Sequence, residues 1–258
     1  MSNPFDQQKP IPGVKKILVV SSGKGGVGKS TGSTHLALAL KEKGLKVGLL
    51  DADIYGPSIP RMLGTLNQKP EIENNLIQPL MAGGLKTMSI GNLVDEDMAV
   101  VWRGPMLFKA MNQFLFEVDW SDTDILVIDL PPGTGDVQLS IAQKIPVTAA
   151  ITVTTPQNIA LADVKKSIDM FRRVNVPMIG VVENMAYFEL PGGDRTSIFP
   201  KGELEDYLKK ENLKKLGEVP LSPQIAQACE VGVPLFYKPD SLQAKIFGDI
   251  ADRILELI

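Results

Sequence analysis

Short apolar runs recur along the chain, and segments whose apolar residues have helical spacing separate them. The runs are rich in β-branched residues and hardly alternate with polar ones, as expected of strands that are buried on both faces of a sheet. Strands and helices that alternate in this way predict an α/β fold, a single domain with a mostly parallel, twisted sheet and helices on both faces. The expected strands cover residues 17–20, 47–50, 125–128, 149–153 and 178–182.

Helical spacing marks residues 30–43, 106–116, 160–174 and 241–258, and a further helix or helix end is expected at 225–230. Two long segments, 56–84 and 189–202, contain several Gly and Pro residues and are expected to be irregular. Loops of this length in a compact domain are usually functional or mobile. Ligands of open α/β sheets bind beyond the carboxyl ends of the strands, so the residues that follow each apolar run are the first candidates for a site.

Composition and charge fit one domain that works in the cytoplasm. The chain has 258 residues, 44% of them apolar, which is enough for a sizeable core, and its net charge of −3 creates no general attraction to nucleic acid or to an anionic membrane. Cys229 is the only cysteine, which excludes an intramolecular disulfide and a zinc site of cysteines and histidines. Residues 1–14 are expected to be a flexible lead-in without the apolar core of a secretory signal, and residues 15–258 to form one folded domain.

The first expected strand leads into a phosphate-binding loop, the P-loop. Residues 23–30 have the pattern of a glycine, four residues and then Gly-Lys-Ser, and a predicted helix follows. Glycines let backbone N–H groups approach phosphate oxygens, and the helix adds the positive end of its dipole. Lys29 would neutralise the β- and γ-phosphates of ATP, and Ser30 would bind Mg²⁺. A glycine-rich turn that binds nothing is the alternative, but it leaves the lysine and the serine at these offsets unexplained. The expected nucleotide-binding residues of the segment are Gly23, Lys24, Gly25, Gly26, Val27, Gly28, Lys29, Ser30 and Thr31.

Carboxylates follow two other expected strands. Asp51 and Asp53 come after residues 47–50 and, being two residues apart, point the same way, toward the crevice at the strand ends. Such a pair can hold metal-bound waters and orient the attacking water, because phosphoryl transfer needs mainly positioning and charge neutralisation. Asp129 stands where a Walker B acid binds Mg²⁺ through Ser30 or a water, and the N–H of Gly133 can reach the γ-phosphate. The alternative for each aspartate is a cap on the turn that follows its strand.

The P-loop variant Lys-Gly-Gly-Val-Gly-Lys-Ser, residues 24–30, resembles that of the MinD/ParA-like ATPases. The resemblance implies that Lys24 reaches the phosphates of the partner in a nucleotide-bridged homodimer; a solvated surface lysine is the alternative. It further implies that Asp53 orients the attacking water and that Asp51 belongs to the outer shell of the metal. Asn184 is assigned to the adenine edge, since an amide has both a donor and an acceptor, although an isolated asparagine more often forms a turn. The expected catalytic residues are Lys24, Lys29, Asp53 and Asp129.

Longer motifs resemble the Mrp-type branch, the iron–sulfur cluster carrier ATPases, from about Lys15 to the C-terminus. The resemblance implies a cytoplasmic homodimer that binds ATP and Mg²⁺, hydrolyses ATP slowly and delivers iron–sulfur clusters to acceptor apoproteins. The motifs are DADIYGPSIP at 51–60, VWRGP at 101–105, IDLPPGTGDVQL at 128–139, VTTPQ at 153–157 and VVENMAYF at 181–188.

One departure from that branch concerns the cluster itself. Typical members have a Cys-x-x-Cys pair after this last motif, and its thiolates bind a bridging cluster across the dimer. Here Leu190 and Gly193 occupy those positions, and neither has a side-chain ligand for iron. Cys229 lies far along the chain, and a buried small apolar residue is its ordinary interpretation. His35 falls inside the helix after the P-loop and is expected to have no catalytic role.

Two further hypotheses remain open from the sequence. One is a MinD/ParA-like positioning or regulatory switch, and the other is a nucleotide-gated adaptor without enzymatic activity. MinD-like proteins bind lipid through a basic amphipathic C-terminal helix, whereas residues 245–258 contain more acids than bases. We therefore expect no stable membrane association and no nucleic-acid partner.

Overall fold

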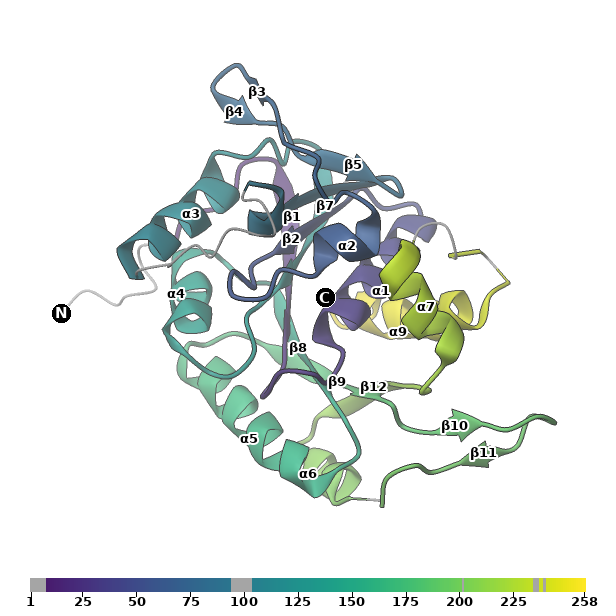
Figure 1. Ribbon diagram of the computed structural model, residues 1–258. Coiled ribbons are helices and arrows are strands. Elements are labelled where there is room, and N and C mark those ends of the chain that lie inside the picture. The colour runs from purple at the N-terminus through teal and green to yellow at the C-terminus, as the bar shows by residue number, and fades with distance from the viewer. Residues whose placement is uncertain (1–7, 94–103, 201, 234–236, 239) are drawn as a thin grey trace.

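A computed structural model describes residues 8–93, 104–200, 202–233, 237–238 and 240–258 (Figure 1). Eight strands form one sheet in the order β12-β9-β8-β1-β7-β2-β6-β5, in which every neighbouring pair is parallel except β5 and β6. This confirms the predicted α/β fold. The strands are β1 (Val14–Ser21), β2 (Val47–Asp51), β5 (Leu80–Ala82), β6 (Leu85–Ser89), β7 (Thr123–Asp129), β8 (Ala149–Thr154), β9 (Met178–Asn184) and β12 (Lys214–Val219).

All five apolar runs lie inside strands of the sheet, while β5, β6 and β12 were not predicted. Of the six residues of β12, only Leu216 and Val219 are buried, because this strand forms one edge of the sheet. Edge strands tolerate charged residues, so an edge strand lacks the apolar run that identifies a central strand. β6 mixes Lys86 and Thr87 with apolar residues and gives the same weak signal.

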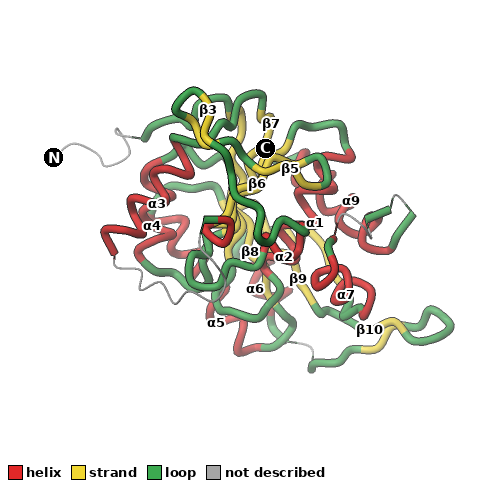
Figure 2. The backbone as a smooth tube through the Cα atoms, turned by 45° about the horizontal axis from the view of Figure 1, so that its top comes forward, coloured by secondary structure: helices red, strands yellow, loops and turns green. Residues whose placement is uncertain are grey.

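Helices cover both faces of the sheet, as Figure 2 also shows. Buried side chains of α1, α7 and α9 pack on one face, and those of α3, α4 and α5 pack on the other. The four long predicted helices and the shorter one at 225–230 are present, whereas α2, α4 and α6 were not predicted. The bounds are α1 (Lys29–Glu42), α2 (Ile59–Leu63), α3 (Gly104–Phe116), α4 (Asp136–Lys144), α5 (Asn158–Arg173), α6 (Leu204–Lys210), α7 (Pro223–Val231) and α9 (Leu242–Leu255).

The two segments expected to be irregular contain short regular elements. Segment 56–84 includes α2, β5 and a hairpin of β3 (Ile72–Glu73) and β4 (Leu76–Ile77). Segment 189–202 begins in a second hairpin, formed by β10 (Phe188–Glu189) and β11 (Arg195–Thr196), which projects from the domain in Figure 1.

The expected lead-in is attached to the domain where the structure describes it. Ile11 is buried, the Lys9 N–H donates to the Lys144 carbonyl, and Val14 already belongs to β1. Residues 1–7 and residues 101–103 of the VWRGP motif lie outside the described residues. Within the described part of the chain, every helix is too short or too polar to cross a bilayer.

The contact between α1 and α9 contains the single histidine. The imidazole of His35 is fully buried, stacks on Phe247 of α9 with 4.9 Å between ring centroids, and places Nδ1 2.9 Å from the Thr31 carbonyl oxygen. Burial lowers the pKa of His35 to about 4, so the ring is neutral and Nδ1–H donates to that carbonyl. His35 therefore packs two helices together.

Acid should weaken the fold through His35. Between pH ~6.5 and pH ~4 the unfolded chain binds a proton that the folded chain does not, so stability is lost as the pH falls through this window. From about pH 7 to about pH 5 the loss from this group should be roughly 2 kcal/mol of the free energy of unfolding, and it should be absent from His35→Gln. Denaturant unfolding of both proteins at both pH values measures the difference. Losses of equal size in the two proteins would contradict a buried neutral His35.

Candidate functional site

The P-loop connects β1 to α1 and leaves space for a phosphate. Gly26 and Gly28 have φ of 79° and 84°, which is the left-handed region that favours glycine. Gly28 also needs its small size, because a Cβ there would lie 2.1 Å from Nδ2 of Asn184. Gly25 and Gly26 face open space, and α1 begins immediately after Gly28. The loop therefore exposes backbone next to the positive end of a helix dipole, as anion binding requires.

Asp129 is the centre of the site. Its carboxylate is fully buried, and its Oδ2 lies 2.6 Å from Nζ of Lys29 and 2.6 Å from Oγ of Ser30. Its Oδ1 lies 2.6 Å from Oγ of Ser33. The sheet produces this arrangement, because Asp129 is in register with Val20 of β1 on one side and with Asp51 of β2 on the other.

The two predicted carboxylates at the end of β2 lie beside Asp129 but differ in their contacts. Asp53 is 9% exposed, and its Oδ2 is 3.7 Å from Nζ of Lys29. Asp51 is fully buried, and its oxygens accept hydrogen bonds from the Asp53 N–H (3.1 Å), the Ile59 N–H (3.3 Å) and Oγ of Ser89 (3.0 Å). Asp51 thus fixes the loop that presents Asp53. Its place in the outer shell of a metal remains a prediction.

The site contains more carboxylate groups than ammonium groups. Burial lowers the pKa of Lys29, but the nearby Asp129, with Asp53 and Asp51, more than offsets this effect and leaves the pKa raised. Burial and the charge of Asp129 raise the pKa of Asp51, and burial likewise raises the pKa of Asp53. Three carboxylates therefore share one ammonium group, and a cation would relieve their repulsion.

Oxygen atoms of Ser30 and Asp129 are suitable ligands for Mg²⁺. Oγ of Ser30 and Oδ2 of Asp129 are hard oxygen ligands only 2.6 Å apart. Magnesium usually takes one or two such protein oxygens and completes its shell with water and substrate phosphates. These two residues would hold the metal, and this role, expected from the sequence, remains a prediction.

A hollow of about 190 Å³ opens beside these groups. It brings together Lys29, Ser30 and Asp53 with backbone of the P-loop, and it is also lined by Ser22, Gly25, Gly26, Gly28, Thr31, Ser58, Met62 and Pro132. Lys24 is half-buried, and among the described residues it has no hydrogen-bond or ion-pair partner. Six of the nine residues of the predicted nucleotide-binding segment thus line this hollow, and Gly23, Lys24 and Val27 do not.

Two groups that were predicted to contact the nucleotide form hydrogen bonds within the protein. The N–H of Gly133, expected at the γ-phosphate, donates to the Ser22 carbonyl at 2.8 Å. Nδ2 of Asn184, expected at adenine, donates to the Val27 carbonyl at 2.8 Å. Both residues lie next to the P-loop, and their contacts with nucleotide remain predictions. Gly23 packs so closely on α5 that a Cβ would lie 2.2 Å from Cβ of Asp163.

Sequence reasoning missed three serines of the site. Ser33 contacts Asp129, Ser89 contacts Asp51, and the buried Oγ of Ser22 has no partner among the described residues. A serine inside a predicted helix gives only a weak signal, because its hydroxyl commonly donates to the carbonyl four residues earlier, and Oγ of Ser33 lies 3.1 Å from that of Lys29.

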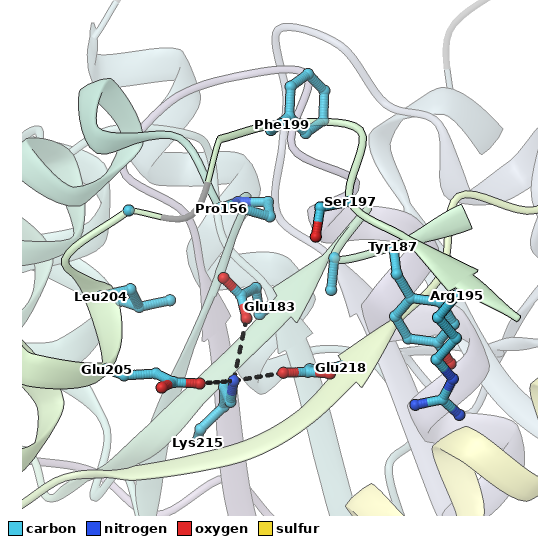
Figure 3. A pocket seen from close by; sticks show the side chains of 12 residues that line it. Pro156, Glu183, Tyr187, Arg195, Ser197, Phe199, Leu204, Glu205, Lys215 and Glu218 are labelled. Carbon is cyan, nitrogen blue, oxygen red and sulfur yellow. Dashed lines mark hydrogen bonds and ion pairs between the residues drawn. The ribbon is translucent and has the colours of Figure 1, made fainter. Parts of the chain in front are cut away.

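A second hollow, of about 230 Å³, lies at the base of the β10–β11 hairpin (Figure 3). Nζ of Lys215 contacts Glu183 at 3.3 Å and Glu205 at 2.7 Å, and it also contacts Glu218. These carboxylates raise the pKa of Lys215, although burial opposes the shift. The guanidinium of Arg195 lies 4.2 Å from the ring centroid of Tyr187. The Lys215 network therefore joins α6 to β9 and β12 at the sheet edge, while Arg195 and Tyr187 pack together at the hairpin base.

The tip of this hairpin contains no thiol. Leu190 is 43% exposed, Gly193 has a φ of 92°, and the turn is closed by hydrogen bonds from the Leu190 N–H to the Asp194 carbonyl and from the Gly193 N–H to the Leu190 carbonyl. Cys229 lies on α7 instead, half-buried, with Sγ 3.6 Å from Oγ1 of Thr31. Burial raises the pKa of the Cys229 thiol, which disfavours the thiolate that iron needs. Among the described residues, no cluster of three or more His, Cys, Asp or Glu side chains could hold a metal ion.

Known proteins with this sequence pattern have names that concern iron–sulfur clusters. The iron-sulfur cluster carrier proteins of Aquifex aeolicus and Escherichia coli are 48% and 51% identical to this chain, over 259 and 250 residues. These alignments cover 99% and 96% of the chain and 71% and 68% of the two proteins. The mouse iron-sulfur cluster transfer protein NUBPL is 47% identical over 260 residues, which is 99% of this chain and 81% of that protein.

Solved structures agree with this relationship. The nucleotide-binding protein of Archaeoglobus fulgidus, solved in complex with ADP, has a TM-score of 0.80 at 35% identity over 93% of this chain and 96% of its own. The cell division ATPase MinD of Pyrococcus furiosus shares the fold, with a TM-score of 0.69 at 24% identity over 94% and 99% of the two chains. The model of the ParA family of NUBPL iron-transfer P-loop NTPases matches residues 13–255. The chain therefore belongs to the ParA/NUBPL family of iron-transfer P-loop NTPases.

Proposed function

We propose that this protein binds ATP and Mg²⁺ at the carboxyl ends of β1, β2 and β7, hydrolyses ATP slowly, and uses this cycle in the delivery of iron–sulfur clusters to apoproteins. One observation supports it above all: Lys29, Ser30 and Ser33 converge on the buried carboxylate of Asp129 beside an open P-loop. The Archaeoglobus relative, solved with ADP, supports nucleotide binding, and the names of the relatives support the cluster pathway. Residues 15–258 would act as one cytoplasmic ATPase domain.

Binding would change the partners of the charged groups in the hollow. The ammonium of Lys29 would leave Asp129 for the β- and γ-phosphates, because phosphate oxygens offer it the stronger charge. Ser30 and Asp129 would then hold Mg²⁺, which neutralises charge on the phosphates when bound. Gly133 would release the Ser22 carbonyl to donate its N–H to the γ-phosphate, and the amide of Asn184 would contact adenine.

Catalysis would depend on Asp53 and on a second subunit. Asp53 lines the hollow, with Oδ2 3.7 Å from Nζ of Lys29, where its carboxylate can orient a water toward the terminal phosphate. Lys24 would reach across a homodimer bridged by nucleotide to the phosphates of the partner. Its half-buried position without a partner of its own among the described residues supports this role.

The cluster would not be held by the hairpin. Leu190 and Gly193 provide no ligand at the positions where relatives of the Mrp type have their cysteine pair, and Cys229 is half-buried on another element. We therefore propose that cluster ligands come from the donor or the acceptor apoprotein, while this chain supplies the ATP-dependent step.

A membrane-bound switch is the weaker candidate. The apolar residues Phe247, Ile250 and Ile254 of α9 are buried in the core against α1, so they are not available to lipid. The proposal includes neither stable membrane association nor a nucleic-acid partner.

Hydrolysis should depend on Asp53. Asp53→Asn keeps the size of the side chain but removes the charge that orients the water, so kcat for ATP hydrolysis should fall by roughly 100-fold or more. Binding of ADP with Mg²⁺, measured by calorimetry, should change little. Asp122→Asn, a substitution on an exposed turn, is the matched control and should hydrolyse ATP like the wild type. An Asp53→Asn protein with full hydrolytic activity would favour the nucleotide-gated adaptor instead.

The cluster proposal has its own test. After anaerobic incubation with iron and sulfide and then desalting, the wild type and Cys229→Ser should both be colourless, whereas a Leu190→Cys, Gly193→Cys double variant should gain visible thiolate-to-iron absorption. With Mg²⁺ and ATP, the wild type should still accelerate activation of an apoprotein by an external cluster donor, and Asp53→Asn should not. A wild type that retains iron would refute the assignment of the ligands, and equal acceleration by both proteins would refute a role for hydrolysis.

A further inference from the structure

We propose that Ser33 is a positioning residue for the magnesium site: its hydroxyl holds Oδ1 of Asp129, so that Oδ2 stays directed at Ser30 and at the metal. The inference rests on the proposed function, since it concerns the same ATP site. The P-loop pattern ends at Ser30 and requires nothing of position 33.

The contact is short and buried. Ser33 is fully buried, with Oγ 2.6 Å from Oδ1 of Asp129 and 3.1 Å from the Lys29 carbonyl oxygen. A hydroxyl has one proton, and the closer acceptor is also the charged one, so the proton is donated to Asp129. Lys29 and Ser33 lie one turn apart on the same side of α1, and the side chains of both, with that of Ser30, reach Asp129 of β7.

The two oxygens of Asp129 have different kinds of partner. Oδ2 is bound by Lys29 and Ser30, and both groups take other partners when ATP and Mg²⁺ bind. Oδ1 has Ser33, whose hydroxyl sits in the interior of α1 and has no role toward the ligand. Ser33 is therefore the side-chain contact that persists through the nucleotide cycle and fixes the rotation of the carboxylate.

The packing of α1 does not by itself require a hydroxyl at position 33. Leu36, Ala37 and Leu40 of the same helix are buried, and Ser inside a helix is less favourable than Ala. A hydroxyl in this position needs a buried acceptor to offset its own desolvation, and Asp129 provides one. The serine is thus explained by the carboxylate that it orients and not by the packing of α1.

Magnesium binding tests the proposal without any measurement of turnover. Mg²⁺ is titrated into protein mixed with a fluorescent ADP analogue, and the half-saturating Mg²⁺ concentration is recorded. Loss of a partner that orients a metal ligand typically weakens metal affinity by about 10- to 100-fold, so Ser33→Ala should need roughly tenfold more Mg²⁺ or higher. In EDTA, the affinity for the analogue should stay within about twofold of the wild type, because Ser33 does not touch the nucleotide.

Ser167→Ala is the matched control. Ser167 is also a buried serine inside a helix, and its Oγ lies 2.9 Å from Oγ of Ser21, so its loss removes a buried hydrogen bond away from Asp129. This variant should lose stability but keep the Mg²⁺ requirement of the wild type. Ser33→Cys, of similar volume and with a weaker donor, should need an intermediate Mg²⁺ concentration and decides the question if Ser33→Ala does not fold.

Two results would overturn the proposal. One is an unchanged Mg²⁺ requirement in Ser33→Ala or Ser33→Cys, and the other is an equal loss of affinity with Mg²⁺ and with EDTA. A wild type that binds the analogue without any effect of Mg²⁺ is a different failure, because it would refute the proposed function as well.

Discussion

The buried ion pair between Lys29 and Asp129 is the interaction on which the site depends. Both groups are almost fully removed from water, and a buried charge is tolerated only when a close opposite charge and hydrogen bonds compensate for its lost hydration. In the proposed function the lysine would have a second, stronger partner in the phosphates of ATP, and the aspartate would have one in Mg²⁺. The pair therefore compensates both charges in the ligand-free site, and under the proposal each charge would gain a new partner when the ligand binds.

The register of the parallel strands brings Asp129 next to the P-loop that carries Lys29. Asp51, Asp129 and the end of β1 are in register on neighbouring strands, so their carboxyl ends meet at one edge and the P-loop turns back over them. Asp51 then fixes the loop that presents Asp53, and Ser33 fixes Asp129 from α1. Each group that would touch ligand is thus supported by a buried group that would not, which is how a site keeps its geometry while its charges change partners.

The features that could be predicted from the sequence are those that a short stretch of residues determines. Apolar runs identified the five central strands, and the Gly-Lys-Ser spacing identified the P-loop, because each of these signals is contained in a short stretch of the chain. It did not reveal β12, whose polar residues suit a sheet edge, or the serines that support the aspartates. Ser33 and Asp129 are 96 residues apart, so only the folded sheet shows that they touch. The outer-shell role of Asp51 stays a prediction, whereas its hydrogen bonds to the Asp53 and Ile59 N–H groups and to Ser89 could be found only from the folded structure.

The most direct measurement is binding of ATP with Mg²⁺ to Lys29→Ala by calorimetry, with Lys46→Ala at an exposed lysine as the control. If Lys29 exchanges Asp129 for phosphate, its loss removes charge-assisted hydrogen bonds from the complex, and affinity should fall by roughly 100-fold or more while Lys46→Ala binds normally. Circular dichroism establishes that the variant is folded. A folded Lys29→Ala protein that binds ATP as tightly as the wild type would contradict the account.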